Sequence, residues 1–111
     1  MKIPGNVYIA PEKITQYLLK KREEDDKSNF LAGAGYSLNS ADLLEIEIRL
    51  QLEKYEAVLY DQTEYGDKYQ IYGELIGVNG VSLKVITIWM HETTSDLWKF
   101  ITLIPDRRTR S

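Results

Sequence analysis

The spacing of apolar residues changes midway along the chain, and this change constrains the fold more than any other feature. Leu44, Ile48 and Leu52 recur every four residues, which places them on one face of a helix. Leu43, Ile46 and Leu50 widen this apolar stripe, which predicts a helix packed on a sheet. From Val58 onward the period becomes that of strands, and residues 81–91 become apolar on both faces, as in a strand covered on each side. Helices followed by strands predict an α+β domain whose helices pack on an antiparallel sheet.

Local signals set the limits of the expected elements. Gly35 is typical of a residue that ends a helix, and Asn39 or Ser40 can cap the start of the next one. The Asn79-Gly80 pair is a strong signal for a hairpin turn. We predict two short N-terminal helices and one long helix, followed by a four-stranded antiparallel meander. The helices are expected at 11–22, 27–34 and 41–56, and the strands at 58–64, 67–77, 81–91 and 97–105.

Size and composition fit one domain. The chain has 111 residues, of which 43% are hydrophobic, enough for one packed core. We predict a single domain over residues 1–105 and a basic, flexible tail over 106–111. The sequence contains no cysteine and no apolar run long enough for a membrane span or a secretory signal, so we expect a soluble cytoplasmic protein without a membrane partner. With one histidine and no thiol, we expect no metal and no cofactor.

Charge is distributed unevenly. Residues 1–22 carry five bases and one acid, residues 23–67 carry twelve acids and three bases, and residues 68–111 carry six bases and four acids. This polarity could serve a charged partner or merely keep the chain soluble. A net charge of −3 disfavours binding that depends on phosphate neutralisation, although aromatic residues alternate with lysines in a pattern that could stack RNA bases. The residues of this pattern are Tyr65, Tyr69, Tyr72, Trp89 and Trp98, with Lys68, Lys84 and Lys99.

Polar residues inside apolar strands are the first candidates for a site. Thr87 and Thr102 stand in the two most apolar expected strands, where a hydroxyl without a partner costs about 1–3 kcal/mol. Strand packing explains both residues, because threonine favours strands. The alternative is that both line one polar pocket on the sheet face that the long helix does not cover. His91 has no matched partner in the sequence and is interpreted as a satisfied surface histidine.

Short motifs along nearly the whole chain carry a resemblance. They are IP at 3–4, KITQYLL at 13–19, KSNF at 27–30, YGDKY at 65–69, TIW at 87–89 and FITLIP at 100–105. In this order and spacing, the chain resembles a bacterial family, common in cyanobacteria, known as domain of unknown function 6883. Its members look like the small endoribonuclease toxins of the barnase, colicin and RelE type. Their genes often neighbour one for a small barrel-like protein, which implies a toxin–antitoxin pair.

The resemblance also implies site residues. The family's lysine after the first helix falls on Lys27, and the basic residue near its last strand falls on Lys99; these cations would hold the phosphate charge. Thr87 and Thr102 would position the phosphate. Further substrate contacts are assigned to Trp89, Tyr69 and Lys13.

One departure from the family pattern concerns the acid–base chemistry. Where the family has a histidine and a glycine before its lysine, this chain has the acidic run 23–26, so the obvious general base is gone unless a carboxylate replaces it. The leading hypothesis is a toxin-like, metal-independent endoribonuclease whose catalysis is weak or lost, acting on RNA. The alternative is a non-catalytic protein-interaction module, antitoxin-like or immunity-like, that binds a cognate small protein.

Overall fold

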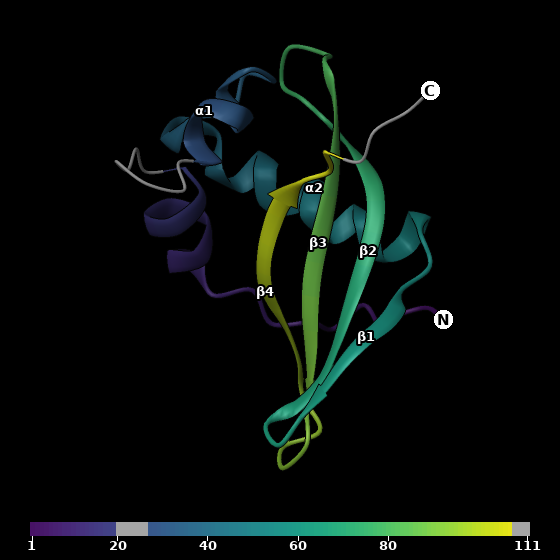
Figure 1. Cartoon of the computed structure of the whole chain (residues 1–111). Coiled ribbons are helices and arrows are strands. Elements are labelled where there is room, and N and C mark those ends of the chain that lie inside the picture. Colours follow the sequence, from purple (N-terminus) through teal and green to yellow (C-terminus); the bar gives the residue numbers. More distant parts are fainter. Residues whose placement is uncertain (20–26, 108–111) are drawn as a thin grey trace.

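The protein is an α+β domain in which helical segments precede a four-stranded sheet (Figure 1). A computed structural model describes residues 1–19 and 27–107, without the side chain of Tyr17. The helical segments are η1 (Lys13–Leu18), α1 (Lys27–Ala32), η2 (Leu38–Ser40) and α2 (Ala41–Lys54). The strands are β1 (Val58–Thr63), β2 (Gly66–Ile76), β3 (Ser82–Glu92) and β4 (Trp98–Pro105).

The helical part differs in detail from the expected three helices. The first segment is a π-helix, in which the Leu19 N–H donates to the Ile14 carbonyl at 3.0 Å, and a short 3₁₀ turn precedes α2. The long helix stops at Lys54 because Tyr55 adopts an extended backbone with φ −130° and ψ 155°. Gly35 follows α1 with φ +86°, the left-handed conformation expected of a terminating glycine. The predicted end of the first helix, near residue 22, lies outside the described residues.

The strands form the predicted antiparallel meander. They are ordered β1-β2-β3-β4. Both the first and the last residue of each strand lie within one residue of the expected limits. Asn79 and Gly80 make the turn between β2 and β3, where Gly80 has φ +85° and the Asn79 side chain accepts from the Val81 N–H at 3.0 Å. The Asn79-Gly80 pair in the sequence was therefore sufficient to predict the position of this turn.

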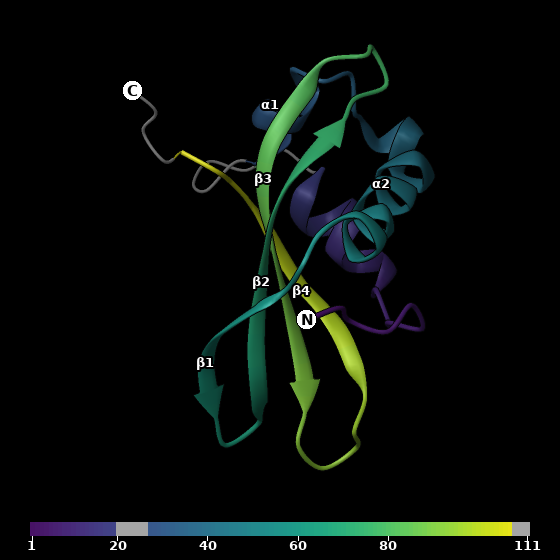
Figure 2. The ribbon, with the colours of Figure 1, turned by 90° about the vertical axis from the view of Figure 1, so that its right-hand side faces the viewer.

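One face of the sheet is covered by α2, which lies to one side of the strands in Figure 2. A Cβ atom on Gly73 would come within 2.3 Å of Gln51 Oε1 and 2.6 Å of the Tyr55 ring, so glycine permits the close approach of helix and strand. Gln51 also donates to the Glu74 carbonyl at 3.0 Å. Leu44 and Ile48 of α2 are fully buried against this face.

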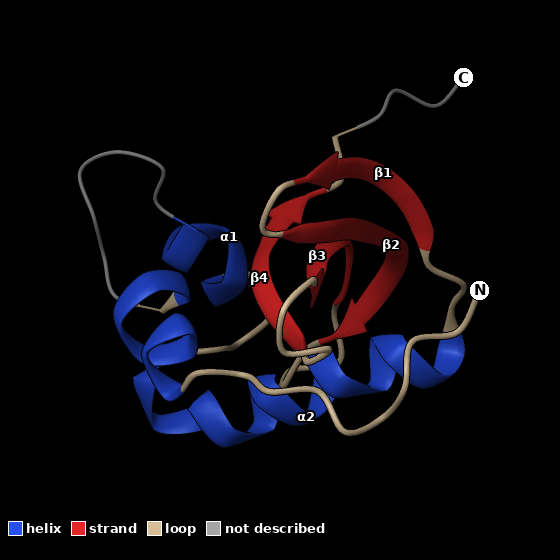
Figure 3. Cartoon of the chain, turned by 90° about the horizontal axis from the view of Figure 1, so that it is seen from below, coloured by secondary structure: helices blue, strands red, loops and turns tan. Residues whose placement is uncertain are grey.

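The two sheet faces therefore have different environments. We call the face under α2 the covered face; Ile71, Thr87 and Leu103 are opposite one another on it. We call the other the open face, because none of its described side chains belongs to the hydrophobic core cluster, although Ile88 and Met90 on it are buried, as expected for a strand covered on each side. Seen from below, α2 lies along one side of the sheet (Figure 3). The open face carries Lys68, Gln70, Tyr72, Lys84, Ile86, Ile88, Met90, Lys99, Thr102 and Ile104.

The segment before the first helix joins the edge of the sheet, which the sequence did not predict. Tyr8 makes a parallel bridge with Lys99: its N–H donates to the Trp98 carbonyl at 3.0 Å, and its carbonyl accepts from the Phe100 N–H at 2.9 Å. The Val7 carbonyl accepts from Arg49 Nη1 at 2.7 Å. This segment thus protects the start of β4 and anchors the N-terminus to α2.

Candidate functional site

The strand threonines do not share one pocket. Thr87 lies opposite Leu103 on the covered face, whereas Thr102 lies opposite Ile88 on the open face. The common pocket, which was the alternative to strand packing, is therefore wrong. A bulge between Ile88 and Trp89 shifts the pairing of β3 and β4, and a bulge of this kind leaves no clear mark in the sequence.

Thr87 and Trp89 form a polar pair inside the core. Both are fully buried, and the Trp89 Nε1–H donates to Thr87 Oγ1 at 2.8 Å. Trp89 also packs edge-on against Phe100, with ring centroids 5.2 Å apart. The hydroxyl predicted to position a phosphate, and the indole predicted to contact a substrate, thus satisfy each other away from the surface.

The predicted lysines lie in different parts of the molecule. Lys27 begins α1 and is buried, and Lys13 begins η1 and is half-buried. Lys99 is the second residue of β4, and this strand begins near the lower end of the sheet in Figure 1, whereas α1 is near the top. Lys27 and Lys99 therefore do not converge on one phosphate in this arrangement.

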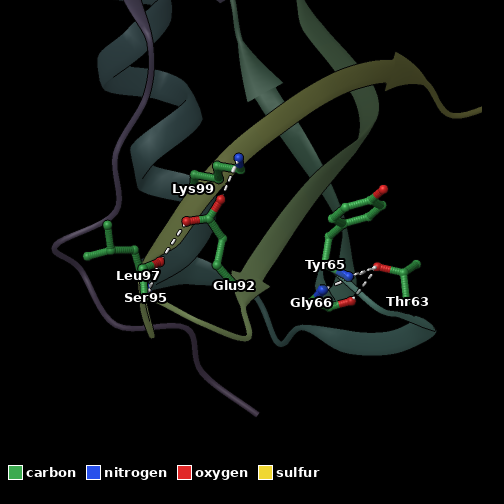
Figure 4. A network of polar contacts seen from close by, with 7 residues as sticks. All are labelled: Thr63, Tyr65, Gly66, Glu92, Ser95, Leu97 and Lys99. Atoms are coloured by element: carbon green, nitrogen blue, oxygen red, sulfur yellow. Dashed lines mark hydrogen bonds and ion pairs between the residues drawn. The ribbon is translucent and has the colours of Figure 1, made fainter.

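Lys99 forms an ion pair with Glu92 at the end of the β3–β4 hairpin. Its Nζ lies 2.7 Å from Glu92 Oε2, and Ser95 donates to the other carboxylate oxygen at 2.7 Å (Figure 4). The hydrogen bonds from Lys99 and Ser95 hold the pKa of Glu92 below its usual value. This carboxylate would compete with a phosphate for Lys99.

The neighbouring β1–β2 turn is joined to the β3–β4 turn by a backbone bond. Thr63 Oγ1 accepts from the Tyr65 and Gly66 N–H groups at 3.2 Å, and the Tyr65 carbonyl accepts from the Thr93 N–H at 3.1 Å. A Cβ atom on Gly66 would lie 2.4 Å from the His91 carbonyl oxygen, so only glycine fits here. These contacts fix the two turns together as the tip of the sheet.

An aromatic cluster lies next to this tip. The Trp98 ring stacks on His91 with centroids 4.4 Å apart and an interplanar angle of 2°, and its distance from the Tyr69 ring is 5.1 Å. His91 Nε2 lies 2.5 Å from Asp96 Oδ1. His91 is thus a satisfied surface histidine as predicted, and Tyr69, a predicted substrate contact, packs against Trp98. Within residues 1–19 and 27–107, no three His, Asp or Glu side chains gather as a metal site.

The outer side of α2 carries an apolar surface that the sequence did not predict. Leu43 and Ile46 were expected to widen the buried stripe of the helix, but they are 45% and 55% exposed. Ile76 and Val78, at the end of β2 and in the following turn, are 42% and 51% exposed. These four residues, which we call the α2 patch, line a depression of about 180 Å³.

Polar groups define the wall of this depression. Tyr36 is buried and donates its hydroxyl hydrogen to the Ile76 carbonyl, while Glu47 Oε1 accepts from the Ile76 N–H at 2.9 Å. Burial and the nearby Glu47 charge raise the pKa of Tyr36 to about 12. The carboxylate of Glu47 therefore lies close to the α2 patch.

A larger open depression, of about 550 Å³, lies beside α1 and is lined by Ser28, Asn29 and Tyr36. Its wall also includes Leu19, the last described residue before segment 20–26. The acidic run 23–26, on which the acid–base question depends, lies outside the described residues. We assign no site to this depression.

The fold and the surface define an α+β domain with one helix-covered and one open sheet face, and with an apolar patch on its long helix. None of its described helices combines the length and apolar character needed to cross a membrane. The chain belongs to the family described as Domain of unknown function (DUF6883), whose model matches residues 4–107. This confirms the family to which the motifs pointed. No curated protein and no solved structure matches the chain.

Proposed function

We propose that the protein is an interaction module that binds a small cognate protein and performs no acid–base chemistry of its own. The α2 patch carries this proposal. Leu43, Ile46, Ile76 and Val78 expose apolar surface beside one another around one depression. Contiguous exposed apolar surface on a soluble domain marks a protein-binding site, because covering it gains about 25 cal/mol per Å².

The arrangement of the predicted catalytic residues favours binding over cleavage. Cleaving RNA without a metal needs a base, an acid and a cation around one phosphate. Thr87 is committed to Trp89 in the core, Thr102 is on the opposite face, and Lys99 is paired with Glu92. The described residues therefore offer a surface for a partner more readily than a catalytic constellation.

Complex formation tests the interaction function directly. The partner to use is the small barrel-like protein whose gene is expected beside those of family members. Mixed at equal concentration, the two chains should elute together in size-exclusion chromatography with the mass of a complex. The matched control is the partner mixed with an unrelated acidic protein of similar size. Separate elution at concentrations well above micromolar would contradict the interaction function.

A second candidate is the toxin-like endoribonuclease, and the open face favours it. Lys68, Lys84 and Lys99 project from this face together with Tyr72 and Thr102, a mixture of cations, an aromatic ring and a hydroxyl that suits single-stranded RNA. In the barnase-like architecture that the family resembles, an open sheet face would be the natural place for RNA.

Induced expression separates the two candidates. The ribonuclease predicts growth arrest and fragmented RNA, and both should be relieved by Lys84→Gln on the open face and by Lys27→Met. The interaction module predicts normal growth and intact RNA when the chain is expressed alone. Cleavage that persists in both variants would remove these two lysines from the site.

A further inference from the structure

We propose that the α2 patch binds a basic amphipathic segment, with an apolar residue in the depression and lysine or arginine side chains facing the acids of α2. This inference rests on the interaction function proposed above. It adds the surface that is used and the chemistry of the partner. It commits to a partner protein as the occupant, with a second copy of the chain as the competing outcome.

The α2 patch already has the shape to receive an apolar side chain. Tyr36 and Glu47 bond to the Ile76 backbone and hold the end of β2 against α2. Leu43 and Ile46 project from the helix at the same depression. An entering apolar side chain would therefore meet a fixed surface, which reduces the entropy cost of binding.

The charges on and around α2 favour a partner with a positive charge. Among residues 1–19 and 27–107, Glu47 is the one acidic residue that lines the depression, and no basic residue of this part lines it. The α2 helix carries four acids and two bases, and one of these bases, Arg49, is ion-paired with Glu45 at 3.0 Å. The potential along the helix is therefore negative, and a partner with lysine or arginine beside its apolar residues would complement it.

The same charges argue against a second copy. A symmetric dimer would bring the α2 patch against itself, because a two-fold interface uses the same surface on both chains. Both Glu47 carboxylates would then lie in one partly desolvated contact, where like charges are unfavourable. A basic partner removes this repulsion and replaces it with attraction.

Peptide binding to the whole 111-residue chain is the test. The probe is a fluorescently labelled synthetic helical peptide with leucines on one face and lysines on both flanks. Its matched control has glutamate in place of every lysine. In fluorescence anisotropy the lysine peptide should bind at least about tenfold more tightly, and its affinity should fall as salt is added.

Variants assign the binding to the patch. Ile46→Ser should weaken binding of the lysine peptide roughly tenfold, as expected for an apolar anchor. Leu97→Ser is the control, because Leu97 is 60% exposed at the distant β3–β4 turn, and it should leave the affinity unchanged. Glu47→Gln keeps an acceptor for the Ile76 N–H but removes the charge, so it should weaken binding about twofold to fivefold and flatten the salt dependence.

Three results would overturn the inference: equal binding of both peptides, equal effects of Ile46→Ser and Leu97→Ser, or a dimer that Ile46→Ser dissociates. Circular dichroism of each variant confirms that it folds, and Ile46→Val provides a milder substitution if Ile46→Ser does not. If the cognate small protein forms a complex that Ile46→Ser leaves intact, the interaction function stands and the α2 patch is wrong. If no complex forms at all, the interaction function itself fails.

Discussion

The inner and outer sides of α2 carry similar residues in different environments. Leu44 and Ile48 are fully buried against the covered face, whereas Leu43 and Ile46, one and two residues away, are 45% and 55% exposed. A sheet contacts a helix along one side only, so side chains rotated by about 100° or more from that line remain outside. Apolar character is thus shared by both sides, and only the inner side contributes to the core.

The largest predicted effect tests this difference within one helix. Ile48→Ala should lower the free energy of unfolding by about 2–5 kcal/mol, because it leaves a cavity in the core. Ile46→Ala removes the same atoms from the surface and should change it by about 0.5 kcal/mol or less. Urea denaturation of the two variants measures both values. Equal losses would show that the outer side of α2 is buried in solution.

The second prediction compares the threonines on the two sheet faces. Thr87→Val keeps the shape but leaves the buried Trp89 Nε1–H without its acceptor, so it should cost about 1–3 kcal/mol. Thr102→Val should cost less, because the Thr102 hydroxyl is only partly buried and its contact with the Leu103 carbonyl is 3.5 Å long. Denaturant unfolding compares the two variants, and Thr87→Ser, which keeps an acceptor, serves as the control. A larger loss for Thr102→Val would reverse the assignment of the two faces.

The order of elements was readable from the sequence because each depends on local patterns. Helical spacing, strand alternation and the Asn79-Gly80 turn predicted the long helix and the antiparallel meander. The contact of Tyr8 with β4 was not predictable, because it is a single backbone bridge between residues far apart in the chain. The π-helical and 3₁₀ geometries likewise depend on packing more than on residue type.

The candidate site was harder to predict than the fold. Sequence patterns identify that Thr87 and Thr102 are polar residues in apolar strands, but their faces depend on strand register, which the bulge beside Ile88 changes. Sequence patterns also do not show how much of the wide apolar stripe on the long helix will be covered by the sheet. Leu43 and Ile46 were therefore taken for core residues, although their exposure is what makes the α2 patch.

The third prediction concerns the boundary between the core and the α2 patch. Tyr36 has its pKa raised from 10.0 to about 12, so above pH 10 the unfolded chain ionises this residue while the folded chain does not. Stability should therefore fall as the pH rises from 10 to 12. Ultraviolet absorbance should show one tyrosine that ionises late, and this signal should be absent in Tyr36→Phe. Titration of every tyrosine in the usual range would contradict the burial of Tyr36 beside Glu47.

The smallest predicted effect concerns the open face, where Glu92 is paired with Lys99. The folded-state pKa of Glu92 is lowered from 4.5, so its contribution to stability is present above that value and is lost as the pH falls through the folded pKa. Glu92→Gln should reduce this loss on the acid side and leave stability near neutral pH slightly lower. Urea denaturation across the acid range measures it, with Glu64→Gln in the neighbouring turn as the control. Because Glu92 is solvated, Glu92→Gln should change the free energy of unfolding less than Thr87→Val does. A larger change for Glu92→Gln would mean that the Glu92–Lys99 ion pair contributes as much stability as the buried Thr87–Trp89 hydrogen bond.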